Sequence, residues 1–484
     1  MKRTPSARNA RPKRWLPRGS AALWACLAVG GACKTATPDE VFSLGSELPG
    51  SGGSSTGRAG SSAAAASASA VGGQANAAGS GSGSSDAGKS ASSDGGAAGG
   101  ESNAAGSSNQ GEPTAGVECG PAPSATPAFT RAALRTAAAD CAIWQYCRVE
   151  ATATALRDAV AALRDDESPA ARALAQRAWR TTMLGWSVAE LFQFGPAGSK
   201  VESAGRDPVH GQGIRDFIYA WPVVGRCRVE EQVIGRAYQK SWAQVQISAR
   251  GLFGLEYLLF YDGADHGCSP NSATGKGWAE LDSAGLASAK LDYAAALSQD
   301  VLAKLSGLRE AWSPDGEDFR QTLIHAKGYD NEQQALNVIA WSLLYLEREV
   351  KDWKVGIPAG VTLTSPVSEP EGALSLSATE SLRENLRGFR ALFQGCGENG
   401  EGLGFDDWLS DVGQGELAAD MLSALDGAQA AAATLPPLHE ASQPELEAFY
   451  QTLRDLTALL KGDFFGPGSA LNLKLPAGVA SDTD

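Results

Sequence analysis

The sequence predicts an all-α fold of two packed helical-bundle halves, preceded by a disordered Gly/Ser/Ala-rich tether. Two observations predict this architecture. Apolar residues recur at helical spacing through most of residues 118–476, whereas the alternating pattern of a half-buried strand is nearly absent. Residues from about 50 to 116 are almost entirely Gly, Ser and Ala, and such a composition cannot bury enough apolar surface to offset the entropy lost on ordering. We therefore expect a tether at 34–117 and a helical domain at 118–484.

The N-terminus has the pattern of an export signal. Residues 1–32 carry seven basic side chains and no acidic ones, and the short apolar run AALWACLAVGGAC ends in small residues before Cys33. This run is too short for a permanent transmembrane helix. It resembles a bacterial lipobox, although Gly30 stands where leucine is usual. We expect residues 1–33 to be a signal peptide with a lipobox at Cys33, so that the lipid anchors an outer-membrane lipoprotein facing the periplasm or the cell surface. A plain secretory signal is the alternative.

Charge and cysteine content limit the classes of partner and site. The chain of 484 residues has a formal net charge of −14, and loss of the basic signal makes it more acidic, so nucleic acid is not an expected partner. Beyond the signal and Cys33, six cysteines remain, and an even number in an exported domain suggests up to three disulfides among about 15 possible pairings. No CxxC pair occurs, which disfavours a zinc site. The disulfide candidates are Cys119, Cys141, Cys147, Cys227, Cys268 and Cys396.

The helices can be placed in order along the chain. Apolar residues recur at i, i+4, i+7 within residues 153–166, and Ser168-Pro169 then provides an N-cap and a first-turn proline for a helix that ends at Gly195-Pro196. Further helical runs are expected at about 229–261, 284–311, 317–353, 377–395, 415–434 and 443–461. The chain could divide near 300–315 or in the proline-rich link at 356–375, and we expect halves at about 118–312 and 313–476.

Two carboxylates lie on apolar faces of predicted helices. Glu190 continues a stripe that includes Trp186, and Glu256 lies beside Phe253 in the segment GLFGLEYLLF. A buried carboxylate is costly unless it is paired, hydrogen-bonded or protonated. Glu256 is therefore either a structural residue that accepts hydrogen bonds from arginine, tryptophan or backbone groups, or a metal ligand or general base. Glu190 is a candidate pocket carboxylate.

The segment around Glu256 resembles the imelysin family, whose motif is Gly-x-His-x-x-Glu followed by Tyr-Leu-Leu. Gly251 and Glu256 match this motif, and Phe253 stands in the place of the histidine. The resemblance extends over about 125–476 through the segments AWRTTMLGWSVAELFQFGP, RDFIYAWPVV, KGYDNEQQALNVIAW and GLGFDDWL. It implies a two-part helical bundle, exported and often lipid-anchored, in a family classed as metallopeptidases with iron-regulated relatives. Glu190 carries over onto the acidic position of the Trp-rich segment.

The missing histidine bears on activity. A catalytic zinc needs about three protein ligands and an open position, no HExxH occurs, and His210, His266 and His325 lack ligand spacing. We expect a non-catalytic binding protein linked to iron or metal uptake, tied to the membrane by its lipid anchor, with an unknown protein or metal as its ligand. The alternative is a metal-dependent peptidase of the imelysin type in which Glu256 binds a divalent metal or iron.

Overall fold

The computed structural model describes residues 117–124, 127–198, 207–223, 225–362, 370–397 and 400–476. The predicted signal peptide, the lipidation site Cys33 and nearly all of the tether lie outside these residues. Within the described ranges the secondary structure is helical without a β-strand, which confirms the all-α prediction. No helix in this part of the chain combines the length and the apolar character needed to cross a bilayer.

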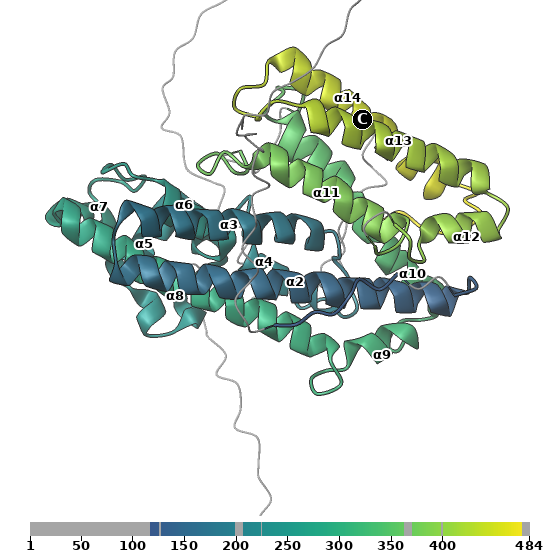
Figure 1. The fold of residues 1–484 in the computed structure, drawn as a ribbon, viewed down its shortest axis with the longest axis horizontal. Helices are drawn as coiled ribbons and strands as arrows, with labels where there is room; N and C mark the ends of the chain where they lie inside the picture. The colour runs from purple at the N-terminus through teal and green to yellow at the C-terminus, as the bar shows by residue number, and fades with distance from the viewer. Residues whose placement is uncertain are drawn as a thin grey trace, which may run out of the picture. The chain divides into compact units, whose positions relative to one another are not determined.

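The N-terminal group of helices packs around α2, which lies against both α3 and α8 (Figure 1). Thr130 caps α2, and Ser168 with Pro169 begins α3 as the sequence predicts. The short helix α6 packs on α3 and α8. The α-helices of this group are α2 (Arg131–Asp165), α3 (Pro169–Ala189), α4 (Ile214–Ile218), α5 (Arg226–Gly235), α6 (Gly251–Phe260), α7 (Ala273–Glu280) and α8 (Ser283–Trp312).

The C-terminal group contains a π-helix, η6, that packs against α14 and α11. The α-helices here are α9 (Phe319–Ile324), α10 (Glu332–Trp341), α11 (Ala378–Phe393), α12 (Phe405–Asp411), α13 (Gly415–Thr434) and α14 (Gln443–Leu459), and the π-helices are η6 (Leu346–Gly356) and η7 (Leu460–Phe464). Short 3-10 helices complete the described structure: η1 (Gly195–Ala197), η2 (Ala237–Gln239), η3 (Trp242–Gln244), η4 (Ile247–Ala249) and η5 (Ser342–Leu344).

Three helices of the C-terminal group contact the N-terminal group: α11 packs against α3, and α9 and α10 pack against α2. At Gly388 an added Cβ would lie 2.6 Å from the carbonyl oxygen of Val188, so only glycine permits this approach. The close approach brings Asn385 of α11 to the C-terminal end of α3, where its amide donates to the carbonyl oxygen of Ser187. The proposed division of the domain near residue 312 stays a prediction.

Two of the expected helical runs are broken. The run at 229–261 ends at Gly235, because Arg236 adopts a φ of 50°, and it restarts only at Gly251, whose φ is 75°. Gly251 therefore begins α6 instead of lying inside a helix, and a Cβ there would lie 2.8 Å from the carbonyl oxygen of Ile218. The run at 317–353 is broken in the same way, where Ala326 and Gly328 have positive φ. Left-handed backbone of this kind ends an α-helix.

Three disulfides are formed, which confirms the prediction of disulfide bonding. Cys119 pairs with Cys147, Cys141 with Cys396, and Cys227 with Cys268. The bond from Cys141 to Cys396 connects α2 to the segment that follows α11, so it ties the N-terminal helices to the C-terminal ones covalently.

Candidate functional site

Glu190 lies at the C-terminal end of α3, where its side chain is 1% exposed. Its Oε1 accepts a hydrogen bond of 2.7 Å from the Asn385 amide and another of 2.8 Å from the Lys354 ammonium. The Arg215 guanidinium lies 3.9 Å from Oε2. The buried carboxylate that the sequence pattern indicated is thus stabilised by two cations and an amide.

Lys354 brings a buried positive charge from η6 into this cluster. Its Nζ lies 2.8 Å from Glu190 Oε1 and 2.8 Å from Glu371 Oε1, and it donates to Asn385 Oδ1 at 2.9 Å. Three acceptors match the three protons of an ammonium group. Burial lowers the pKa of Lys354, but the carboxylates of Glu190 and Glu371 outweigh burial and raise it. The lysine is therefore charged and holds the two carboxylates together.

Aromatic rings enclose the Lys354 ammonium. Its Nζ lies 5.9 Å from the ring centroid of Tyr219, 5.8 Å from that of Trp221 and 5.4 Å from that of Tyr345. Rings at this distance attract a cation through their negative faces and exclude water. The π-helical turn of η6 places the lysine among them, and turns of this type recur at functional sites.

Glu371 is the second carboxylate of the cluster and comes from the link before α11. Its Oε1 accepts hydrogen bonds from the Tyr219 hydroxyl and interacts with the Lys354 ammonium. Burial raises its pKa, the Lys354 charge opposes that rise, and the Glu190 charge adds to it. Sequence reasoning missed Glu371, because the proline-rich link has no helical pattern from which its burial could be inferred.

Glu256 enters the same region from α6 and is fully buried. Its Oε1 accepts a 2.7 Å hydrogen bond from the backbone N–H of Ser375, four residues after Glu371. Burial raises the pKa of Glu256 to about 7, hydrogen bonds from Ser375 oppose this rise, and the nearby Glu371 adds to it. A hydrogen bond from a backbone group is what the structural interpretation of Glu256 predicts, and the roles of metal ligand and general base stay predictions.

Phe253 occupies the motif's histidine position without the chemistry of a histidine. The residue is buried, and its ring packs edge-on against Tyr219 at 6.4 Å between centroids. Because the Tyr219 hydroxyl donates to Glu371, the phenylalanine supports the ring that orients this carboxylate. Gly251 is the third motif position, and its lack of a side chain allows α6 to lie close to the backbone at Ile218.

Glu256→Gln is expected to change how stability depends on pH. A folded-state pKa of about 7 lies above the ordinary value of 4.5, so proton binding favours the folded state. The stability that this group contributes is present below pH 4.5 and is lost as the pH rises through about 7, by about 3 kcal/mol. The glutamine can still accept from Ser375 without titrating. Urea unfolding should therefore show that the free energy of unfolding of the variant, relative to that of the wild type, is higher at about pH 8 than at about pH 5.

Glu280→Gln, at an exposed position of α7, is the control and should follow the wild type at both pH values. An equal difference between Glu256→Gln and the wild type at both pH values would contradict the raised pKa.

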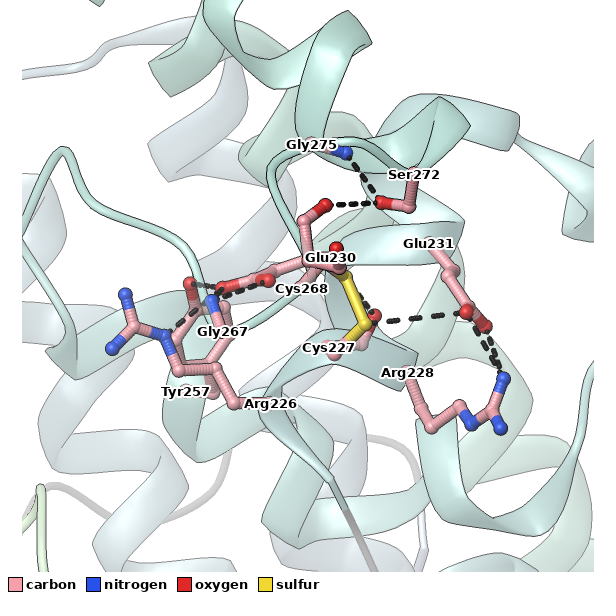
Figure 2. The surroundings of a disulfide bond; sticks show 11 residues. Arg226, Cys227, Arg228, Glu230, Glu231, Tyr257, Gly267, Cys268, Ser272 and Gly275 are labelled. Carbon is pink, nitrogen blue, oxygen red and sulfur yellow. Dashed lines mark hydrogen bonds and ion pairs between the residues drawn. A yellow bond between two sulfur atoms is a disulfide. The ribbon is translucent and has the colours of Figure 1, made fainter. Parts of the chain in front are cut away.

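The described residues contain one cluster of three metal-type ligands, formed by Cys227, Glu230 and Cys268. Figure 2 shows that the two cysteines are joined in a disulfide, which leaves no thiolate for a metal. Both Glu230 oxygens accept hydrogen bonds, from Arg226, Tyr257 and the N–H of Gly267. This cluster is therefore a structural cross-link beside an ion pair between the buried Glu230 and the half-buried Arg226.

Glu256 belongs to no group of three metal-type ligands among the described residues. Phe253 supplies no ligand atom, and Ser375 occupies Glu256 Oε1. Two of the histidines named in the sequence analysis make contacts with aromatic rings. His210 packs on Phe319 and Tyr329. His266 packs near Trp278. His325 ends α9.

The family model described as Imelysin matches residues 142–460 of the chain, a range that includes Glu190, Glu256, Lys354 and Glu371. The chain belongs to the imelysin family. None of the curated proteins matches it. Within the family, this chain combines the motif's glycine and glutamate with a phenylalanine between them.

Solved structures of similar fold include the following two. An imelysin-like protein from Psychrobacter arcticum 273-4 aligns with a TM-score of 0.53 at 16% identity, over 72% of this chain and 99% of that one. A putative iron-regulated protein A precursor from Parabacteroides distasonis ATCC 8503 aligns with a TM-score of 0.51 at 17% identity, over 70% of this chain and 96% of that one. At these identities the similarity supports the fold and not a shared ligand.

Proposed function

We propose that this imelysin-family chain is an exported, lipid-anchored binding protein that performs no hydrolysis. One observation carries the proposal: the ammonium of Lys354 lies between the carboxylates of Glu190 and Glu371, at 2.8 Å from each. A side-chain cation in this position neutralises the buried carboxylates and repels a metal ion from them. The Oε1 atoms of both buried acids then have partners within the protein itself.

The motif positions support the same conclusion. A hydrolytic metal site needs about three protein ligands and an open position for water. The chain offers Phe253 in place of a histidine, and the Glu256 carboxylate already accepts from the Ser375 backbone. We therefore propose that α6 retains the frame of the family motif for packing and not for catalysis.

Export and anchoring are proposed from separate features. Three disulfides are typical of proteins outside the reducing cytoplasm. The lipobox-like segment before Cys33 and the long tether would hold the domain away from an outer membrane. A link to iron uptake is proposed because one protein of similar fold is named a putative iron-regulated protein A precursor.

A metal-dependent peptidase remains the second candidate. The observation that favours it is the pKa of Glu256, which burial raises to about 7, close to the value that suits a general base at neutral pH. This candidate requires an attacking water and a metal beside Glu256, and the hydrogen bond from Ser375 competes for the same oxygen.

The metal content of the purified, exported protein distinguishes the two candidates. We expect zinc and iron far below one ion per chain by plasma mass spectrometry, and no cleavage of unfolded protein substrates. Phe253→His should also bind no stoichiometric zinc, because Ser375 and Lys354 remain in place. Phe260→His, at the end of the same helix, is the matched control. One zinc or iron per chain that is lost in Glu256→Gln would overturn the proposal.

A further inference from the structure

A cavity of about 150 Å³ is lined by residues of α3, of α6 and the segment after it, and of the first turns of α8. Arg172 and Lys290 are its two cationic side chains. Asp262 and Ser283, which also line it, are exposed, so the cavity opens to solvent. A cavity of this volume can hold a molecule the size of benzene. The apolar residues of the wall are Leu258, Ala264, Leu286, Ala287 and Leu291.

Lys290 places its amine at the wall of this cavity. The side chain comes from α8 and is 7% exposed. Its Nζ donates to the carbonyl oxygens of Tyr261 at 3.2 Å and of Gly263 at 3.4 Å, and both of these residues line the cavity. The ring centroids of Tyr257, Tyr261 and Trp278 lie 5.4, 5.3 and 5.5 Å from Nζ. The amine is therefore held in one place beside the cavity.

The surroundings of Lys290 favour a nucleophilic amine. Burial lowers the pKa of Lys290, the guanidinium groups of Arg226 and Arg172 lower it further, and nearby carboxylates oppose the shift only in part. Lys354 is held between two carboxylates, whereas the described neighbours of the Lys290 ammonium are carbonyl oxygens and rings. A desolvated lysine near another cation is neutral more often, and the neutral amine attacks carbonyl carbons.

Arg172 has donors for an acid group in the same cavity. Its Nη1 donates to the carbonyl oxygen of Leu259 at 3.4 Å and lies 3.9 Å from Asp262 Oδ1. Its Nε and Nη2 donate to no described residue, so this edge of the guanidinium is open. Two parallel N–H donors of this kind fit a carboxylate in bidentate geometry. A ligand with a carboxylate next to a carbonyl group can therefore use both Arg172 and Lys290.

We propose that this cavity binds a small α-keto acid covalently, as an imine of Lys290, with the carboxylate of the acid on Arg172. The neutral amine attacks the keto carbon to form a carbinolamine. The keto oxygen then leaves as water with the two protons of the amine, and the C=N bond forms. No oxidant or reductant is consumed, and water reverses the reaction.

The contacts of Lys290 also suit the imine. Once protonated from solvent, the imine keeps one N–H, which donates to the carbonyl oxygen of Tyr261 or Gly263. The surrounding aromatic rings stabilise its positive charge. The site shares no residue with the cluster of Glu190, Lys354 and Glu371, so this inference goes beyond the proposed function and is tested separately.

Treatment of the full exported chain with pyruvate and cyanoborohydride tests the proposal. Cyanoborohydride reduces an imine to a stable secondary amine, which peptide mass spectrometry locates. We expect labelling of Lys290 to saturate with pyruvate concentration and to be at least tenfold faster than labelling of Lys276, an exposed lysine of α7. Ala287→Trp should remove this preference by filling the cavity. Ser288→Trp, at the exposed neighbouring position of α8, should behave like the wild type.

Arg172→Gln tests the carboxylate contact. Labelling of Lys290 by pyruvate should fall at least tenfold in this variant, whereas labelling by the neutral ketone acetone should not change. Lys290 labelling no faster than that of Lys276, or equal in Ala287→Trp and the wild type, would overturn the imine site. No loss with pyruvate in Arg172→Gln, or an equal loss with both ketones, would overturn the α-keto acid as the ligand. Should Ala287→Trp fail to fold, saturation and the rate relative to Lys276 decide. The metal content bears on the proposed function alone.

Discussion

Lys354→Met is expected to destabilise the protein by about 3–5 kcal/mol at neutral pH, because it leaves buried carboxylates without their cation. Glu190 and Glu371 each lose a partner at 2.8 Å, and they then repel each other. Methionine is similar to lysine in length and fills the space between the aromatic rings. The loss of stability is therefore caused more by the missing charge than by altered packing. Chemical unfolding of the exported domain, followed by circular dichroism, measures the change.

Two further measurements identify the cause. The penalty should shrink as the pH falls, because the unpaired carboxylates acquire raised pKa values and bind protons in the folded state. Combining Lys354→Met with Glu190→Gln and Glu371→Gln should recover much of the stability, since the two carboxylates that lost the lysine are then uncharged. Lys276→Met, at an exposed position, is the control. A loss that neither low pH nor the triple variant reduces would assign Lys354 a packing role.

Removing the disulfide between Cys141 and Cys396 should cost about 5 kcal/mol. The two cysteines are separated by 255 residues, so the bond restricts the unfolded chain far more than a short cross-link does. The measurement is the denaturation midpoint of the doubly substituted variant, with alanine at both positions. An alanine pair is preferred to reduction, because a reductant would open the other two disulfides as well.

The pair Cys119 and Cys147 provides the matched comparison, because it closes a separation of only 28 residues. In the chain-entropy description its removal should cost about 2 kcal/mol less than removal of the longer link. Equal losses for the two bonds would show that native contacts, and not restriction of the unfolded chain, determine their contributions.

The helical fold and two of the buried acids could be predicted from local patterns. Helical periodicity, the Ser168 cap and the apolar faces around Glu190 and Glu256 are all short-range signals. The helix breaks at Arg236 and Ala326 could not be predicted in this way, because neither residue favours positive φ on its own. Tertiary packing holds them in the left-handed region.

The charge cluster itself was not predictable, because its contacts are distant in sequence. Lys354 meets Glu190 across 164 residues, and Glu256 meets Ser375 across 119. In the sequence Lys354 resembles an ordinary solvent-exposed lysine at the end of a charged helix. Glu371 lies between prolines and glycines that indicate only a link. The resemblance to the family motif pointed to the segment that forms α6, but it did not point to the link that provides Glu371 and the Ser375 N–H beside Glu256.

The link at 370–377 makes the buried charge network cooperative. The Glu371 carboxylate accepts a hydrogen bond from Tyr219 and forms an ion pair with Lys354. The backbone N–H of Ser375 donates to Glu256, and the carbonyl oxygen of Ser375 accepts from Arg180 of α3. Displacing the link removes these partners together, so α3, α6 and η6 cannot detach singly without stranding buried charges. We therefore expect the two groups of helices to unfold together in one transition.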